Sequence, residues 1–418
     1  MIAMNDPKNK MAASHQKAID LAIGWSFQQA SRNRYPSSDH EGVALKGPRG
    51  DMAGKPLNAA GAVPVFVGMC GDWKFFAETF NHQTTWATEE TCVLCRAHKT
   101  ADDLCLANAL PNAPWVHTHR SHLDYIRQQE ELGTRHPFTK IPGFHIQNTY
   151  EDALHDDMLG MRPLAVASAL KELVDLGFFG ESDLAGGWKT SMDLKLTRAW
   201  DDFTAWLKQN RESCFMTPFS CSVLSLKKLD DYPCLKAKGA ACATCSKWLA
   251  VRAAEYADAH PQHVHIMRAL TLRGFAVVYE AYHFRDDNGM MTEAEANILE
   301  QGRSAALLGY NACAKAAVAR GAFLWPIIPK YHKLDHLLRR SIRTRMSASM
   351  LWTFSDEDMM KWMSSTVRNS HGLGLLKFPV MRWLFFLSGS SIRQLLSASL
   401  VEQMHCARFE WQSAIGIK

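Results

Sequence analysis

The chain has 418 residues, of which 47% are hydrophobic and 21% are charged, and its formal net charge is +5. This composition excludes a disordered or fibrous protein and is typical of a soluble globular one. The length allows two or three domains, or one domain with a large insertion. The small positive charge indicates only that an anionic partner would not be repelled.

The chain contains eleven cysteines, and its first residues show neither the apolar core nor the cleavage site of a signal peptide. We therefore expect a reducing, intracellular compartment, where cysteine pairs more often bind metal than form disulfides. The longest apolar run near the C-terminus, Phe378 to Leu387, is too short to span a bilayer and contains Arg382. We expect no membrane anchor.

The sequence pattern divides the chain into four regions. Residues 1–61 contain one helix-like stretch and then a Gly-, Pro-, Ser- and Asn-rich segment that is typical of loop or disorder. Residues 62–160 contain two candidate strands, residues 161–328 have a helical periodicity, and residues 329–418 hold paired histidines, an acidic cluster and closing helices. The helices expected in the third region cover residues 164–176, 194–207, 237–257, 263–283 and 293–322.

The first candidate strand, Ala62 to Cys70, is a nearly continuous apolar run of the kind that is buried on both faces of a sheet. It ends in Gly71-Asp72. An aspartate just past the carboxyl end of a buried strand lies where α/β folds place active-site groups. A helix N-cap is the structural alternative, because Asp favours that position. A second short strand is expected within residues 140–148.

A C-x2-C motif, Cys92-Val-Leu-Cys95, follows about twenty residues later. Such a knuckle presents two thiolates to one zinc ion and needs two further ligands. Nearby candidates are His98, Cys105, His117 and His119, and more distant ones are Cys242/Cys245 and His332/His336. Two unpaired core cysteines are the alternative, and it is stronger for Cys242/Cys245, whose spacing also fits one buried helix face.

The segment Asp152-Ala-Leu-His155-Asp156-Asp157 combines a D-x-x-H pattern with further acids. It fits a metal or proton-transfer site. It fits equally well the acidic start of a helix, where carboxylates interact favourably with the helix dipole. Both interpretations remain open at this point.

His332 and His336 are four residues apart, so on a helix they share one face and can reach a common ligand. Asp335 between them could orient one imidazole. A basic run follows, and it is either a solvated helix face or a set of phosphate contacts. Its members are Arg339, Arg340, Arg343 and Arg345, with Lys330 and Lys333 before them.

Ser355-Asp356-Glu357-Asp358 then opens an apolar-periodic helix. Ser355 is a good N-cap, and Asp358 three residues on imitates a capping box. One of these acids could be catalytic, although capping alone also explains them.

The order of these features resembles the catalytic region of DDE/D transposases of the CACTA-like group. A strand ending in Gly-Asp, a C-x2-C, a long helical insertion that starts near D-x-x-H, an H-x3-H and then an acid at a helix start follow one another between about residues 62 and 390. The resemblance implies a ribonuclease-H-like α/β core, here partial, with a large and mostly helical insertion, so that the chain is predominantly helical overall.

Transferred motif by motif, the resemblance implies that Asp72 is the second catalytic acid and Glu357 the final one, with Asp356 or Asp358 as alternatives. It also implies that Cys92, Cys95, His332 and His336 share one structural Zn2+. The catalytic cofactor would be Mg2+ or Mn2+, because two such ions activate the attacking oxygen and stabilise the leaving one.

The resemblance further implies DNA as the partner, gripped by the arginines Arg339 to Arg345, a nuclear location, and an oligomeric state that is open between monomer and homo-oligomer. One departure matters. The family's first acid lies on a strand upstream, whereas the residues before Asp72 show no run of strands, and Asp51 lies in a Gly/Pro-rich stretch. We therefore expect a truncated or decayed transposase-derived protein without strand transfer.

Two alternatives compete with this expectation. One is a non-enzymatic, zinc-stabilised DNA-binding or protein-interaction module, which needs the four cysteine and histidine ligands but no carboxylate site. The other is an unrelated metal-dependent hydrolase, which would gather Asp152, His155, Asp156 or Asp157 with the histidines in a pocket that excludes Asp72.

Overall fold

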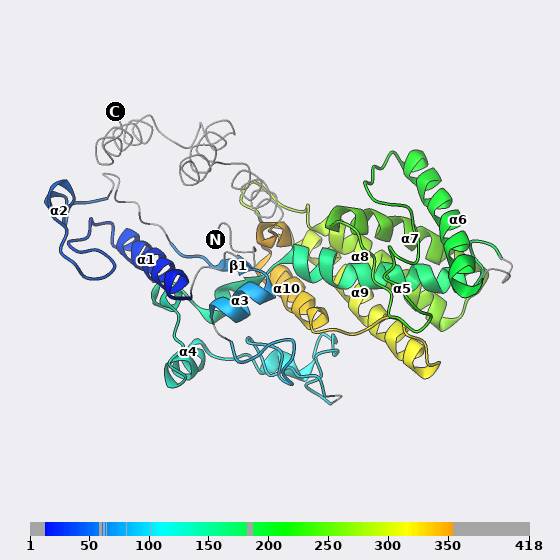
Figure 1. Cartoon of the computed structure of the whole chain (residues 1–418), viewed down its shortest axis with the longest axis horizontal. Helices are drawn as coiled ribbons and strands as arrows, with labels where there is room; N and C mark the ends of the chain where they lie inside the picture. Colours follow the sequence, from blue (N-terminus) through cyan, green and yellow to red (C-terminus); the bar gives the residue numbers. More distant parts are fainter. Residues whose placement is uncertain are drawn as a thin grey trace. The chain divides into compact units, whose positions relative to one another are not determined.

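The computed structural model describes residues 13–57, 61, 63, 65–80, 82–100, 102–181 and 187–353, and those from Lys17 to Thr353 belong to one compact unit. Within them helices predominate, and two short strands form a parallel pair (Figure 1). The expectation of a predominantly helical chain is therefore confirmed. None of the described helices is long and apolar enough to cross a membrane.

The described helices are α1 (Ala13–Ser31), α2 (Pro48–Asp51), α3 (Trp73–Thr79), α4 (His122–Glu131), α5 (Arg162–Asp175), α6 (Gly187–Asn210), α7 (Gly239–Ala259), α8 (His263–Ala281), α9 (Glu293–Ala319) and α10 (Lys330–Thr344). The strands are β1 (Met69–Gly71) and β2 (Thr149–Glu151). Short 3-10 helices lie at η1 (Pro114–His117), η2 (Pro137–Lys140), η3 (Ile146–Asn148) and η6 (Ala348–Leu351), and η4 (Leu154–Met161) is a π-helix that runs into α5.

Helices α5 to α9 form the larger helical part of the molecule, and each of the five helices expected between residues 161 and 328 is present. Helix α8 packs closely against α9. The absence of a side chain at Gly274 permits this approach, because a Cβ there would come within 2.3 Å of the Ala306 backbone nitrogen. Helix α9 begins with a capping box in which Thr292 and Glu295 each bind the other's backbone N–H.

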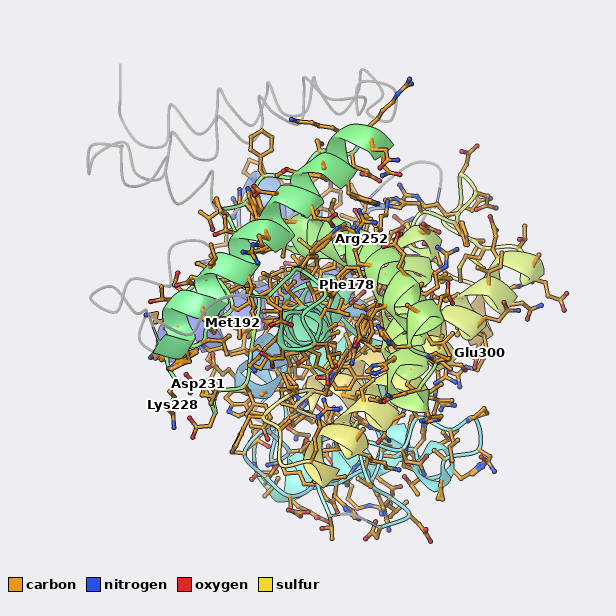
Figure 2. All side chains as sticks on the ribbon, turned by 90° about the vertical axis from the view of Figure 1, so that its right-hand side faces the viewer. Phe178, Met192, Lys228, Asp231, Arg252 and Glu300 are labelled. Carbon is orange, nitrogen blue, oxygen red and sulfur yellow. The ribbon has the colours of Figure 1, made fainter. Side chains whose placement is uncertain are left out.

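Polar groups also join these helices, whose side chains fill the space between them in Figure 2. On the rim, Arg252 of α7 binds the Asp202 carboxylate of α6 at 2.7 and 2.9 Å. In the interior, the fully buried Arg162 pairs with Asp157 of the π-helix and donates to the Ser246 hydroxyl at 2.9 Å and to the Phe275 carbonyl at 2.7 Å. These bonds satisfy a charge that would otherwise be costly to bury.

Both strands are shorter than the sequence pattern predicts. The apolar run Ala62 to Cys70 forms a strand only from Met69, and the side chains of Val65 and Val67 are 74% and 76% exposed. The prediction of a long, doubly buried strand was therefore wrong, because no second neighbouring strand or covering helix in the described chain shields those valines. The second predicted strand is displaced: residues 146–148 form a 3-10 turn, and the strand is Thr149–Glu151.

The two strands pair in parallel, with Met69 opposite Thr149 and Gly71 opposite Glu151. Their carboxyl ends therefore meet at one edge, and the residues that follow are Asp72 and Asp152. The connection between β1 and β2 contains the C-x2-C motif and α4, and α10 later packs against β2. A partial α/β arrangement is present, but two short strands alone do not define a ribonuclease-H-like core.

Candidate metal centre

Cys92 and Cys95 lie in a tight loop whose backbone turns toward their sulfur atoms. The N–H of Leu94 donates to Cys92 Sγ and the N–H of Ala97 donates to Cys95 Sγ, both at 3.4 Å. The Leu94 carbonyl accepts the N–H of Arg120 at 2.9 Å, which fixes the loop to the next segment. Both cysteine side chains are fully buried. This geometry is that of a knuckle that presents two sulfurs in one direction.

His332 and His336 come from α10, which begins directly after Pro329. Every residue from Tyr331 to Leu338 is buried, so this helix passes through the interior of the protein. The Tyr331 hydroxyl donates to the Leu307 carbonyl of α9 at 2.7 Å and holds the first turn in place. Because the two histidines are one helical turn apart, their rings project toward the same point.

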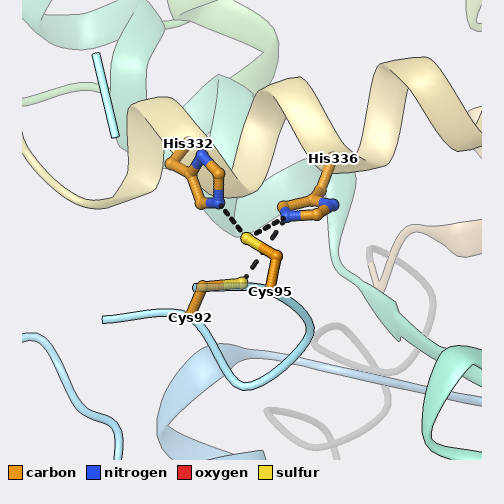
Figure 3. A group of neighbouring side chains, drawn as sticks. All are labelled: Cys92, Cys95, His332 and His336. Carbon is orange, nitrogen blue, oxygen red and sulfur yellow. Dashed lines mark hydrogen bonds between the residues drawn. The ribbon is translucent and has the colours of Figure 1, made fainter. Parts of the chain in front are cut away.

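The four predicted ligands meet at that point, although more than two hundred residues separate the cysteines from the histidines (Figure 3). The Nε2 atom of His332 lies 3.2 Å from Cys95 Sγ, and Nε2 of His336 lies 3.3 Å from Cys95 Sγ and 3.5 Å from Cys92 Sγ. All four ligand atoms lie within 4.8 Å of one another.

These distances fit a tetrahedral metal site. Around a zinc ion with Zn–S near 2.3 Å and Zn–N near 2.0 Å, neighbouring sulfur and nitrogen atoms are about 3.5 Å apart. Two sulfurs and two imidazole nitrogens form a closed four-ligand set of the structural type, with no position left for water. The cluster could therefore hold a metal such as zinc. Cys242 and Cys245, the other candidate pair, are both buried on α7 and take no part in it.

The protonation states suit a metal as well. Burial lowers the pKa of His336 to about 3, so its imidazole is neutral. Burial opposes ionisation of Cys92, but a hydrogen bond from the Cys95 thiol and the nearby Lys333 charge lower the pKa of Cys92 well below its ordinary value. Burial and the neighbouring Cys92 raise the pKa of Cys95. A bound metal would displace any thiol proton, because the thiolate is the form that binds metal.

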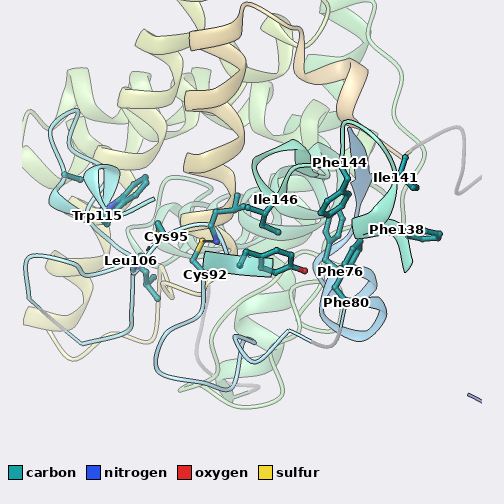
Figure 4. Close-up of a cluster of buried hydrophobic side chains, with 14 residues drawn as sticks. Phe76, Phe80, Cys92, Cys95, Leu106, Trp115, Phe138, Ile141, Phe144 and Ile146 are labelled. Atoms are coloured by element: carbon teal, nitrogen blue, oxygen red, sulfur yellow. Dashed lines mark hydrogen bonds between the residues drawn. The ribbon is translucent and has the colours of Figure 1, made fainter. Parts of the chain in front are cut away.

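An apolar and aromatic shell surrounds the four ligands. In Figure 4 the two cysteines lie between Trp115 and Leu106 on one side and Phe76 and Phe80 on the other. The Trp115 ring lies 4.5 Å from the ring of His332 and 4.8 Å from that of His336, measured between centroids. Such a shell excludes water and competing ligands from the site.

Asp335 does not act as the sequence suggests. Its carboxylate accepts from Arg303 at 2.6 Å and from Arg339 at 3.0 Å, and within the described chain no hydrogen bond joins it to an imidazole. Among the described residues, the buried Nδ1 of His332 has no hydrogen-bond partner. The fully buried Arg303 also donates to the Ala109 carbonyl, so this network joins α9 and α10 to the loop that leads to Trp115.

The basic run on α10 divides into two halves. Arg339 donates to the carbonyls of Ala109, Leu110 and Pro111, and Arg340 donates to the Thr149 carbonyl at 2.7 Å. These two guanidinium groups form hydrogen bonds within the protein, whereas Arg343 and Arg345 are exposed.

Lys333, which the sequence places on the same basic surface, is 2% exposed and pairs with Glu151 of β2, beside the Trp73 ring. That part of the predicted basic surface was wrong. Nothing in the local sequence distinguishes Lys333 from an exposed lysine, because its partner lies on a distant strand.

Asp72 caps helix α3: its Oδ1 atom accepts the Phe75 N–H at 2.6 Å, as the N-cap alternative predicts. The prediction that it approaches Glu357 stays a prediction, because Glu357, Asp356 and Asp358 lie outside the described residues. The described chain ends at Thr353. This residue donates its backbone N–H and its hydroxyl to the carboxylate of Asp152, at 3.0 and 2.5 Å.

Asp152 and its neighbours form a second polar group, which sequence reasoning left undecided. Asp152 is buried and also pairs with His155 and accepts the Leu154 N–H at 2.9 Å. Asp157 is neutralised by Arg162, whereas Asp156 is buried with no hydrogen-bond partner for Oδ2 among the described residues. Burial, together with the nearby Glu151 charge, raises the pKa of Asp156 well above its ordinary value.

In comparisons with known proteins, no protein-family model, no curated protein and no solved structure matches the chain.

Proposed function

We propose that this chain is a transposase-derived protein whose fold is stabilised by one structural zinc ion and which binds DNA without transferring strands. The observation that carries the proposal is the meeting of Cys92 and Cys95 with His332 and His336. The resemblance to CACTA-like transposases pairs these four residues through the order of the motifs along the chain. No local pattern requires that pairing.

The position of the cluster explains what the metal would do. It joins the loop after α3 to α10, and α10 in turn contacts α9, the π-helix η4 and β2. A metal at this point would close a very long loop of chain and fix the helical segments against the strand pair. Because ligand residues seldom form a site in the unfolded chain, the binding energy of such a metal contributes directly to folding.

The carboxylates at the two strand ends differ in how far protein partners occupy them. Catalytic Mg2+ or Mn2+ would need carboxylate oxygens with free lone pairs. Asp72 uses one oxygen to cap α3, and the Asp152 carboxylate accepts two hydrogen bonds from Thr353, accepts a third from Leu154, and pairs with His155. The Asp152 carboxylate is therefore occupied by protein partners.

An unrelated hydrolase built on Asp152 to Asp157 has less support. That alternative needs these acids and the metal-binding histidines in one pocket that excludes Asp72. Instead, His332 and His336 point to the cysteines, and Asp152 follows the strand that is paired with the one before Asp72.

The metal part of the proposal is tested by zinc content and thermal stability of the purified chain. Cys92→Ser and His336→Ala should both lose bound zinc and lower the melting temperature. Cys105→Ser is the matched control, because Cys105 lies in the same loop region and is no member of the cluster. Zinc content that is equal in all three variants would contradict the assignment of the ligands.

The DNA part is tested by duplex binding and by plasmid nicking in the presence of Mg2+ or Mn2+. We expect salt-sensitive binding and no metal-dependent nicking. Nicking that Asp72→Asn abolishes would show an active nuclease and overturn the inactive assignment. A zinc-loaded protein that does not bind DNA would instead favour a protein-interaction module.

A further inference from the structure

A small cavity lies directly beside the metal centre. It has a volume of about 150 Å³, and its walls come from the knuckle, the following segment and α4. Arg96, which lines it, is the residue after Cys95, and the ring of His119, which also lines it, lies 5.5 Å from that of His336. The full lining consists of Arg96, Thr118, His119, Arg120, Asp124, Tyr125 and Gln128.

Backbone contacts fix the walls of this cavity. The Arg96 N–H donates to the Thr118 hydroxyl at 3.1 Å, and the Arg120 N–H donates to the Leu94 carbonyl inside the knuckle. The cavity therefore inherits its shape from the loop that holds the two metal-binding sulfurs. Its volume is that of a few water molecules, which is enough for one tetrahedral oxyanion but not for a nucleobase with its sugar.

The polar lining favours an anion. Arg96 is exposed and has no acceptor among the described contacts, and the Nε donor of Arg120 is buried without a partner there, while its terminal nitrogen pairs with Glu90. Thr118 and Gln128 add neutral polar groups. Guanidinium groups bind phosphate oxygens through short, charge-assisted hydrogen bonds, and an unpaired buried donor gains most from such an acceptor.

Positive charge also continues beyond the cavity. The guanidinium group of Arg343 interacts electrostatically with His119, which lines the cavity. Arg343 is exposed, so it extends the positive field from the cavity onto the end of α10. Two carboxylates oppose this field: Glu90, which pairs with Arg120, and Asp124, which accepts the Ser121 hydroxyl at 2.7 Å and lies 3.6 Å from Arg127.

We propose that this cavity binds one backbone phosphate of DNA, with Arg96 and Arg120 as the two phosphate ligands. The inference rests on the proposed DNA-binding function. It assigns a DNA phosphate contact to the loop of the metal knuckle rather than to Arg339 and Arg340, whose guanidinium groups bind backbone carbonyls of the protein. A metal in the knuckle would then have a second effect, because it would fix the loop that positions Arg96 and binds the Arg120 backbone.

The test measures affinity for a fluorescein-labelled DNA duplex of mixed sequence over a range of salt concentrations. Arg96→Gln should weaken binding about tenfold, the loss expected for one charge-assisted hydrogen bond. It should also reduce the slope of log K against log salt by about 0.9, the value for one lost phosphate contact. Asp124→Asn should strengthen binding, since it removes the only carboxylate in the lining.

The matched control is Arg273→Gln, which removes the same charge from an exposed position on α8 and should leave affinity and slope close to wild type. Equal effects of Arg96→Gln and Arg273→Gln, or weaker binding by Asp124→Asn, would overturn the inference while leaving DNA binding itself intact. A wild-type chain that binds no DNA would overturn the proposed function together with this site.

Inorganic phosphate, titrated alone by calorimetry, separates a free anion from a nucleic-acid phosphate. Phosphate binding that disappears in Arg96→Gln, combined with unchanged DNA affinity of the same variant, would identify a free-anion site and contradict the proposal. A parallel loss of both supports it.

Discussion

The buried ion pair between Lys333 and Glu151 directly couples the metal-binding helix α10 to strand β2. The Lys333 side chain is 2% exposed, and its ammonium group lies 5.2 Å from the centre of the Trp73 ring. Burial alone would lower the pKa of Lys333, but the Glu151 charge raises it instead, so the lysine is charged in the folded protein.

Removal of one partner leaves the other charge buried and uncompensated. We therefore expect Lys333→Met to reduce the free energy of unfolding by about 3–5 kcal/mol. Glu151→Gln should cost less, because the carboxyl group of Asp156 also interacts with Lys333 and can compensate part of the lost charge. The double variant should cost clearly less than the sum of the two, with a coupling energy of about 2 kcal/mol or more.

Urea unfolding followed by far-ultraviolet circular dichroism measures these differences. The control is the exposed pair Lys74 and Glu78, whose side chains are 64% and 67% exposed and 3.8 Å apart, so that Lys74→Met should cost less than about 1 kcal/mol. The reasoning would be refuted if Lys333→Met behaved like Lys74→Met, or if the effects of Lys333→Met and Glu151→Gln were additive.

Three further variants test the interior of the protein. Burial raises the pKa of Asp156, so the stability that its protonated form contributes is present below the ordinary pKa near 4 and is lost as the pH rises toward the pKa in the folded protein. Asp156→Asn should therefore become more stable relative to wild type in urea melts as the pH increases from about 4. Parallel pH profiles of the two proteins would contradict this. Gly274→Ala would place a Cβ against the Ala306 backbone and push α8 away from α9. It should reduce the free energy of unfolding by about 1–3 kcal/mol and lower the melting temperature. An unchanged melting temperature would show that the two helices can move apart without cost. Arg162→Met leaves Asp157 buried without its cation and should cost about 3–5 kcal/mol in urea melts, and a loss under 1 kcal/mol would mean that the ion pair is solvated.

The metal ligands were predictable because their signals are short-range. Cys92 and Cys95 have the spacing of a zinc knuckle, and His332 and His336 are one helical turn apart. Each half of the site can therefore be recognised from its local sequence. The pairing of the halves came from the order of motifs in a resembling family. The helices from α5 to α9 were likewise predictable, since their apolar periodicity is long and regular.

The charged residues of α10 were not predictable, and the reason is physical. The sequence of α10 is amphipathic, so Lys333 and Asp335 look like residues of an exposed polar face, although every residue from Tyr331 to Leu338 is buried. Those partners, Glu151 and Arg303, lie on other elements. The prediction of a strand around Val65 was wrong for a related reason. An apolar run becomes a buried strand only where other elements cover it.

X-ray absorption spectroscopy of the purified chain reads out the ligands of the metal centre directly. We expect one zinc per chain, with two sulfur ligands near 2.3 Å and two nitrogen ligands near 2.0 Å, from Cys92, Cys95, His332 and His336. A folded protein that is free of metal, or a metal bound only by oxygen and nitrogen atoms, would contradict it.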